Sequence, residues 1–255
     1  MIKAIYIIWL RGVKQSLRQR VRFISHLGQP LLWMFLLGTG LRGSVSMESM
    51  GLITQEIDYM AFMLPGIIGM TLLFSSMMGG MRVLYDKKFG FLKELMVAPI
   101  SRVSIVLGIN LASATISILQ GTVIILLASL IGINLDLFHI PIALLFIFMI
   151  GVTFTSLGVA LATKMEDIWT FQGIQTFVNL PLFLLSGAFF PITKLPYPIQ
   201  MLAYLNPLFY GVDGLRSALI GVSTLPMWFD LLAVISFCAA LILLSTYLFN
   251  KSEGM

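Results

Sequence analysis

The chain has 255 residues, of which 58% are hydrophobic and only 11% are charged, and its formal net charge at pH 7 is +5. Soluble domains have about 25% charged residues, so this composition excludes an ordinary water-soluble protein. A net positive charge can indicate nucleic-acid binding, but the placement of the basic residues along this chain favours a different explanation.

Six apolar runs come close to or exceed the ~20 residues that a membrane-crossing helix needs. They predict spans at 23–41, 59–81, 103–131, 140–163, 168–190 and 226–249. Strands of a membrane barrel alternate polar and apolar residues, and these runs do not. We therefore expect an all-α integral membrane protein with six transmembrane helices, forming one transmembrane domain over residues 1–255.

The interiors of the six runs contain no acidic residue and no lysine or arginine, and Asp230 lies near the outer end of the last run. Carriers that use a proton or ion gradient usually need such groups inside the membrane. If the protein transports a substrate, we expect a partner to supply the energy.

Thirteen of the 16 basic residues fall on one side of the membrane if there are six spans. They are Lys3, Arg11, Lys14, Arg18, Arg20, Arg22, Arg82, Lys87, Lys88, Lys93, Arg102, Lys164 and Lys251. Cytoplasmic loops are rich in Lys and Arg, so both termini are predicted to lie in the cytoplasm of a prokaryote. The positive charge thus reports topology, and nucleic acid is not an expected partner.

The N-terminal segment 1–22 has the period of an amphipathic helix over residues 2–18. Lys3, Arg11, Lys14 and Arg18 share one face. The opposite face is apolar and consists of Ile2, Tyr6, Trp9, Leu10, Val13 and Leu17. Such a helix suits the cytoplasmic membrane interface. It serves either as a topology anchor or, in addition, as one wall of a lateral gate for an amphipathic substrate.

Two of the predicted spans have uncharged polar residues on one helical face. The first contains His26, Gln29 and Trp33, and the fifth contains Gln172, Gln175 and Asn179, at the same spacing. Polar residues inside a membrane avoid lipid and face other helices or a cavity. They either make interhelical hydrogen bonds or line a substrate pathway between the two spans.

The loop at 82–102 is the most charged stretch after the N-terminus. Gly90 can begin a short helix, and Pro99 ends it at about Ala98. Because apolar and charged residues are mixed here, the helix is expected to be amphipathic. It either lies flat on the membrane or fills a groove on another protein.

The outer segment, residues 191–225, is apolar but interrupted by prolines. Irregular backbone persists at membrane depth only where protein or water surrounds it. We predict two short re-entrant helices, at about 198–205 and 208–220, before the last span. Asn206 is expected to cap the second, with Pro207 at its first position. They form a lid over the outer ends of the spans.

Two motifs resemble those of the ABC-2 type transporter permeases, particularly the short drug-export permeases of the daunorubicin-resistance type. The loop sequence FGFLKELMVAPISR is similar to the family's coupling element, and SGAFFPITKLPYPIQMLAYLNPLFYGVDGLR at 186–216 is similar to its outer segment. The resemblance implies coupling to an ATPase through Phe89, Gly90, Leu92, Glu94, Leu95, Pro99 and Arg102. It implies an outer gate that includes Pro191, Pro196, Asn206, Pro207 and Arg216.

The resemblance also implies partners. ATP and Mg would bind to a separate ATPase subunit, since the chain has no P-loop motif and is not expected to be an enzyme. A second copy would complete the path as a homodimer, and the polar faces of spans 1 and 5 would line it. No metal site and no cofactor are expected in this chain.

The leading expectation is the permease subunit of an ABC exporter in the plasma membrane (the inner membrane of a Gram-negative cell). It would export a drug-like or lipid-like amphiphile, as in multidrug efflux, by alternating access. An exporter of polysaccharide or lipid-linked glycan is the first alternative, and a secondary carrier or channel is the alternative of another class.

Overall fold

The computed structural model describes residues 2–19, 21, 24–25, 28, 30–32, 35–36, 59–91 and 100–251. Over these residues all regular secondary structure is helical, and no strand occurs. The helices are α1 (Ile2–Arg18), α3 (Tyr59–Lys88), α5 (Arg102–Leu130), η1 (Leu137–His139), α6 (Ile140–Thr163), α7 (Ile168–Leu184), η2 (Ile192–Lys194), α8 (Tyr197–Tyr204), α9 (Pro207–Ile220) and α10 (Met227–Lys251). The expected all-α class is confirmed.

Four of the described helices are long and apolar enough to cross a membrane: α3, α5, η1 with α6, and α10. They match four of the six predicted spans. The first predicted span, 23–41, lies largely outside the described residues. The count of six therefore remains a prediction, and the protein is a multi-pass helical membrane protein.

The fifth predicted span is shorter than expected. It was predicted to run over 168–190, but α7 ends at Leu184 after 17 residues. At 1.5 Å per residue this length covers about 26 Å, less than the ~30 Å of a bilayer's hydrocarbon core. Pro181 lies in the last turn of α7, and Gly187 then adopts a left-handed φ of 70°, which turns the chain away from the helix axis.

The second predicted span is longer than expected. It was predicted to end at residue 81, but α3 continues to Lys88, so residues 82–88 of the predicted loop are helical. The chain leaves the helix at Phe89 and Gly90, where Gly90 has a φ of 80°.

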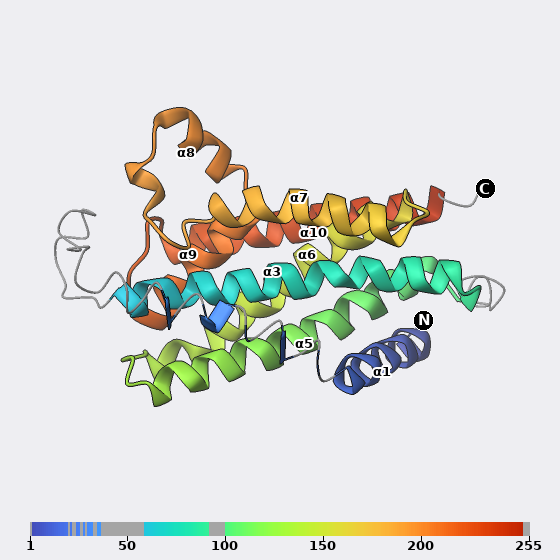
Figure 1. Ribbon diagram of the computed structural model, residues 1–255, viewed down its shortest axis with the longest axis horizontal. Helices are drawn as coiled ribbons and strands as arrows, with labels where there is room; N and C mark the ends of the chain where they lie inside the picture. Colours follow the sequence, from blue (N-terminus) through green and yellow to red (C-terminus); the bar gives the residue numbers. More distant parts are fainter. Residues whose placement is uncertain are drawn as a thin grey trace.

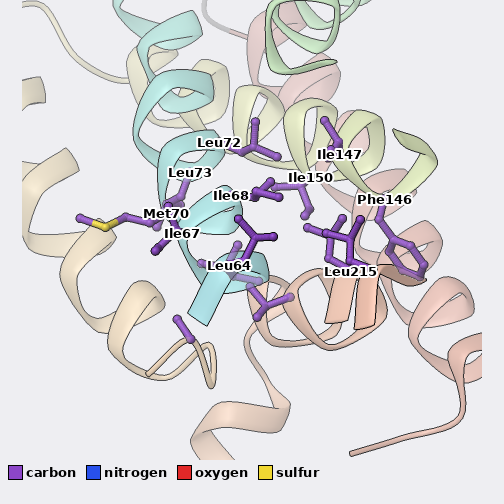
Figure 2. Close-up of a cluster of buried hydrophobic side chains, with 14 of the residues drawn as sticks. Leu64, Ile67, Ile68, Met70, Leu72, Leu73, Phe146, Ile147, Ile150 and Leu215 are labelled. Carbon is purple, nitrogen blue, oxygen red and sulfur yellow. The ribbon is translucent and has the colours of Figure 1, made fainter. Parts of the chain in front are cut away.

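The core lies where α3 packs against α6 and α9. Figure 2 shows Leu64, Ile68 and Leu72 of α3 directed toward Ile147 and Ile150 of α6, with Leu215 of α9 beside them. All six side chains are buried. Buried polar pairs join the same helices to α5: the hydroxyls of Ser76 and Ser117 lie 3.1 Å apart, and the amide of Asn110 donates to Ser156. Such pairs satisfy polar groups away from water and hold the helices in register.

The two ends of the bundle differ. In Figure 1 the N-terminal helix α1, the last turns of α3, the start of α5 and the C-terminal end of α10 lie at one end. The start of α3, η1, α8 and α9 lie at the opposite end, and α8 stands away from the bundle. The Arg102 guanidinium donates to the backbone carbonyl of Asn250 at 2.9 Å, which joins α5 to α10 at the first end.

Candidate functional site

The outer segment contains short helices that begin at its prolines, as the sequence predicts. Pro191 precedes η2, Pro196 precedes α8, and Pro207 is the first residue of α9. The Asn206 side chain caps α9 by accepting from the Leu208 N–H at 3.0 Å. The same side chain donates to the Leu182 carbonyl at 2.6 Å, which attaches the start of α9 to the end of α7. Both predicted short helices and the predicted cap are confirmed, and their re-entrant position in the membrane stays a prediction.

Arg216, which the resemblance assigns to the outer gate, lies inside the protein. Its side chain is 3% exposed, and its guanidinium donates to the Gly187 carbonyl at 2.7 Å. It also lies 3.6 Å from the Asp213 carboxylate and 4.1 Å from the centre of the Phe62 ring. These contacts join α9 to the turn after α7 and to α3, so movement of one of these three elements affects the other two.

Asp213 and Asp230 are buried as well. Asp213 accepts hydrogen bonds from the backbone N–H groups of Thr224 and Leu225, which shape the turn between α9 and α10. The sequence contained one signal for this: an acidic and a basic residue three apart on an otherwise apolar half-helix.

The predicted polar face of α7 is divided. Gln175 and Asn179 are buried in a stripe with Phe171 and Phe183, while Gln172 is exposed. The Asn179 amide has no hydrogen-bond partner in the described part of the chain. The first-span residues of the predicted pathway, His26, Gln29 and Trp33, lie outside the described residues. The predicted pathway between the two faces therefore stays a prediction.

Helix α1 docks against the bundle. Ile8 is buried against Gly108 of α5, where a Cβ would lie 2.8 Å from the Ile8 side chain. The Trp9 indole donates to the Thr115 hydroxyl at 2.9 Å. Ile2, Tyr6 and Leu17 of the predicted apolar face stay exposed. The predicted helix is thus confirmed at residues 2–18, but a different face of it contacts the protein.

Two arginines join α1 to the end of α3. Arg11 of α1 forms a paired contact with the Asp86 carboxylate, at 2.7 and 3.0 Å, and its guanidinium lies 3.7 Å from the centre of the Phe91 ring. Arg82 of α3 donates to the Gly12 carbonyl at 3.4 Å and to the Ser16 hydroxyl. Bidentate contacts of this kind fix both distance and orientation, so α1 and the exit of α3 are positioned together.

Comparison with known proteins identifies the family of this chain. The family model of the ABC-2 type transporter matches residues 3–220. The chain belongs to the ABC-2 type transporter family. It is 29% identical over 217 residues to the putative transport permease ycf38 of Cyanophora paradoxa, covering 84% of this chain and 73% of the relative.

Two further relatives are bacterial. Nodulation protein J of Rhizobium leguminosarum bv. trifolii is 28% identical over 220 residues, which is 85% of this chain and 78% of that protein. The inner membrane transport permease YadH of Escherichia coli K12 is 26% identical over 202 residues, 78% of this chain and 77% of that protein. The chain is thus similar to transport permeases, and its family implies an ABC ATPase subunit as partner.

The predicted coupling residues of this ABC-2 permease are only partly described. Phe89 is 77% exposed and stacks on Tyr85, with ring centres 6.2 Å apart, and Gly90 makes the turn that ends α3. Arg102 is the first residue of α5. Leu92, Glu94, Leu95 and Pro99 lie outside the described residues. A groove between α1 and the end of α3 reaches Phe89 and Phe91, beside Arg11 and Arg82.

Proposed function

We propose that this ABC-2 permease is the membrane subunit of an ATP-driven exporter that moves a drug-like or lipid-like amphiphile out of a prokaryotic cytoplasm. The family match over residues 3–220 is the observation on which the proposal rests. ATP and Mg bind to the separate ATPase subunit, and this chain converts the movement of that subunit into alternating access of a path through the membrane.

The exit from α3 is the proposed point of contact with the ATPase. Phe89 is exposed there, and the element that begins at this point, residues 89–98, resembles the family's coupling helix. Helices α3 and α5 flank it and have 30 and 29 residues, so each extends about 45 Å. Displacement of the coupling element therefore tilts two long helices whose far ends lie beside the outer segment.

The path itself is proposed to lie between two copies of the chain. α7 exposes Gln172 together with Phe177 on its outward side. Exposed polar side chains are unfavourable against lipid, so a second copy or an aqueous path is the expected neighbour. Both termini are assigned to the cytoplasm by the distribution of basic residues, and α1 then lies at the cytoplasmic interface.

Reconstitution tests the proposal. The purified permease in liposomes should not transport unaided and should export an amphiphilic dye when its ATPase subunit and ATP are supplied. Glu94→Lys or Pro99→Leu should reduce dye transport at least tenfold while leaving membrane insertion intact. Glu166→Lys, a matched charge reversal in the turn between α6 and α7, should have little effect. Uphill pumping by the permease alone, or full coupling in both loop variants, would refute the proposal.

An exporter of polysaccharide or lipid-linked glycan is the second candidate. Trp169 and Phe177 on α7 are both highly exposed, and aromatic rings offer flat apolar faces to sugar rings. Loss of glycan at the cell surface on deletion of the gene, with dye efflux unchanged, would favour it. Transport driven by a sodium or proton gradient without an ATPase would favour the third candidate, a secondary carrier or channel.

A further inference from the structure

Asp230 is a fully buried carboxylate with no partner among the residues that the structure describes. It lies in the first turn of α10, is 0% exposed, and neither of its carboxylate oxygens accepts a hydrogen bond from any described residue. Burying an ionised carboxylate without hydrogen bonds or a counter-charge is strongly unfavourable. The helix dipole at the start of α10 favours the ionised form, but that effect is smaller than the cost of burying a lone charge.

The charged groups around Asp230 do not neutralise it. The charge that acts on it is that of Asp213 on α9, which has the same sign. The cation on α9, Arg216, already contacts Asp213 and the Gly187 carbonyl. Tyr210 of α9 donates its hydroxyl hydrogen to the Tyr204 carbonyl.

The other elements packed against α10 offer no counter-charge at this end. Helix α6 contains no titratable residue, and the charged residue of α5, Arg102, lies at the opposite end of the bundle. At the outer end, Asp136 and His139 are paired with each other at 2.6 Å and exposed. The described part of the outer end therefore contains two buried carboxylates and one buried guanidinium, and that guanidinium is paired with Asp213.

We propose that Asp230 is a proton-binding site of the outer gate, occupied by a proton in the conformation described here. A proton removes the charge without any further ligand. A metal ion would need several oxygen ligands, and the described residues contain no group of three or more His, Cys, Asp or Glu side chains that could hold one. Both oxygens of Asp213 are taken up by backbone N–H groups as well.

The proton couples opening of the gate to pH, a step that rests on the proposed function. When α9 moves away from α10, water reaches Asp230, and a hydrated aspartic acid ionises above about pH 4. The closed conformation then binds one proton more than the open one. Closed-state stability therefore falls as the outer pH rises, and the ratio of open to closed forms increases up to tenfold per pH unit.

Infrared spectroscopy tests the bound proton without any transport assay. The full chain in lipid nanodiscs at pH 7 should show the C=O stretch of a protonated carboxyl group. Asp230→Asn, which keeps the shape of the neutral acid, should lose that band, and Asp136→Asn, which removes the exposed acid at the same end, should keep it. If Asp230→Asn does not fold, Asp230→Glu should shift the band. A spectrum unchanged by these Asp230 substitutions would overturn the assignment.

Accessibility of a buried cysteine tests the gate. Ala218 of α9 is 0% exposed, so Ala218→Cys in a Cys238→Ser background reports opening through its reaction with an impermeant maleimide. Relative to the exposed control Ser223→Cys, its labelling should accelerate with pH, up to tenfold per unit, and Asp230→Asn should abolish that dependence. Asp136→Asn and His139→Gln should leave it unchanged.

The outcomes separate the two proposals. If ATP-dependent transport is absent but the infrared band depends on Asp230, the exporter function fails and the proton site stands. If the band is absent and sodium or potassium stabilises the wild type but not Asp230→Asn, Asp230 binds a cation and the proton site is wrong. A pH dependence that survives in Asp230→Asn would overturn the gating role.

Discussion

Two glycines determine how closely α3 approaches α6. A Cβ placed on Gly80 would overlap the carbonyl of Gly158, and a Cβ on Gly158 would lie 2.5 Å from the carbonyl oxygen of Met77. The obstacles are backbone atoms, which cannot rotate away as side chains do. Any larger residue here must separate α3 from α6, which pack against each other in the core.

We predict that Gly80→Val destabilises the permease by more than about 2 kcal/mol, because overpacking against backbone forces the helices apart. The measurement is the unfolding midpoint of the purified protein in detergent. Gly173→Ala is the matched control on α7: no neighbouring atom lies within 4 Å of the position that its Cβ would take, so it should be neutral or slightly stabilising. Equal midpoints for the two variants would contradict the close α3–α6 packing.

The exposed pair of Asp136 and His139 behaves differently from the buried charged residues Asp213, Arg216 and Asp230. The pKa of Asp136 lies below the ordinary aspartate value, chiefly because its carboxylate is hydrogen-bonded to the His139 side chain. Desolvation acts in the opposite direction but does not cancel this effect. Because the folded-state pKa is lowered, any contribution of this pair to stability is present above the ordinary aspartate pKa and is lost as the pH falls below it. A rise in pH therefore favours the contribution of the Asp136–His139 pair to stability, whereas it lowers the stability of the closed conformation through Asp230.

At the scale of elements, α1 packs against the bundle, and the sequence predicts that it also lies at the membrane interface. Its contacts with Asp86 and Phe91 place it at the start of the proposed coupling element. The Arg11–Asp86 pair is partly exposed, so its contribution to stability is about 0.2–1 kcal/mol. Its larger consequence is geometric, because it sets the position of α1 relative to the end of α3.

We predict that Arg11→Glu lowers the unfolding midpoint only slightly but releases α1 from α3, which should show as faster proteolysis near the N-terminus. The double exchange Arg11→Glu with Asp86→Arg should recover part of this protection, since the charges attract again. Lys14→Glu, at an exposed position on the same helix, is the control and should leave proteolysis unchanged. A double variant no better protected than Arg11→Glu would contradict the pair.

At the scale of the whole molecule, both ends of the described chain lie at one end of the bundle, and η1 and the outer segment lie at the other (Figure 1). The sequence predicts that the end with both termini is cytoplasmic. Cys238 is buried in α10, so its replacement by serine gives a background for site-directed labelling.

We predict that Lys3→Cys and Lys251→Cys in the Cys238→Ser background resist an impermeant thiol reagent in intact cells and react after permeabilisation. Phe138→Cys, in η1, should react in intact cells because this side chain is 85% exposed. Labelling of either terminal cysteine from outside would reverse the proposed orientation.

The sequence by itself determined the membrane class, the helical architecture, the bounds of α1 and the two outer half-helices with their Asn206 cap. These features depend on local properties: hydropathy over 20 residues, helical period, and the fixed geometry of proline beside a capping side chain. A short stretch of chain contains all the information they need.

Only the tertiary structure decided where α3 and α7 end, which face of α1 docks, and that Asp213, Arg216 and Asp230 are buried. These features depend on partners that the sequence does not place side by side. Arg11 and Asp86 are 75 residues apart, and Arg216 reaches a carbonyl 29 residues away. Whether a charged side chain near a helix end is solvated or buried is decided by what packs over it, and here the helices that cover the charges come from separate parts of the chain.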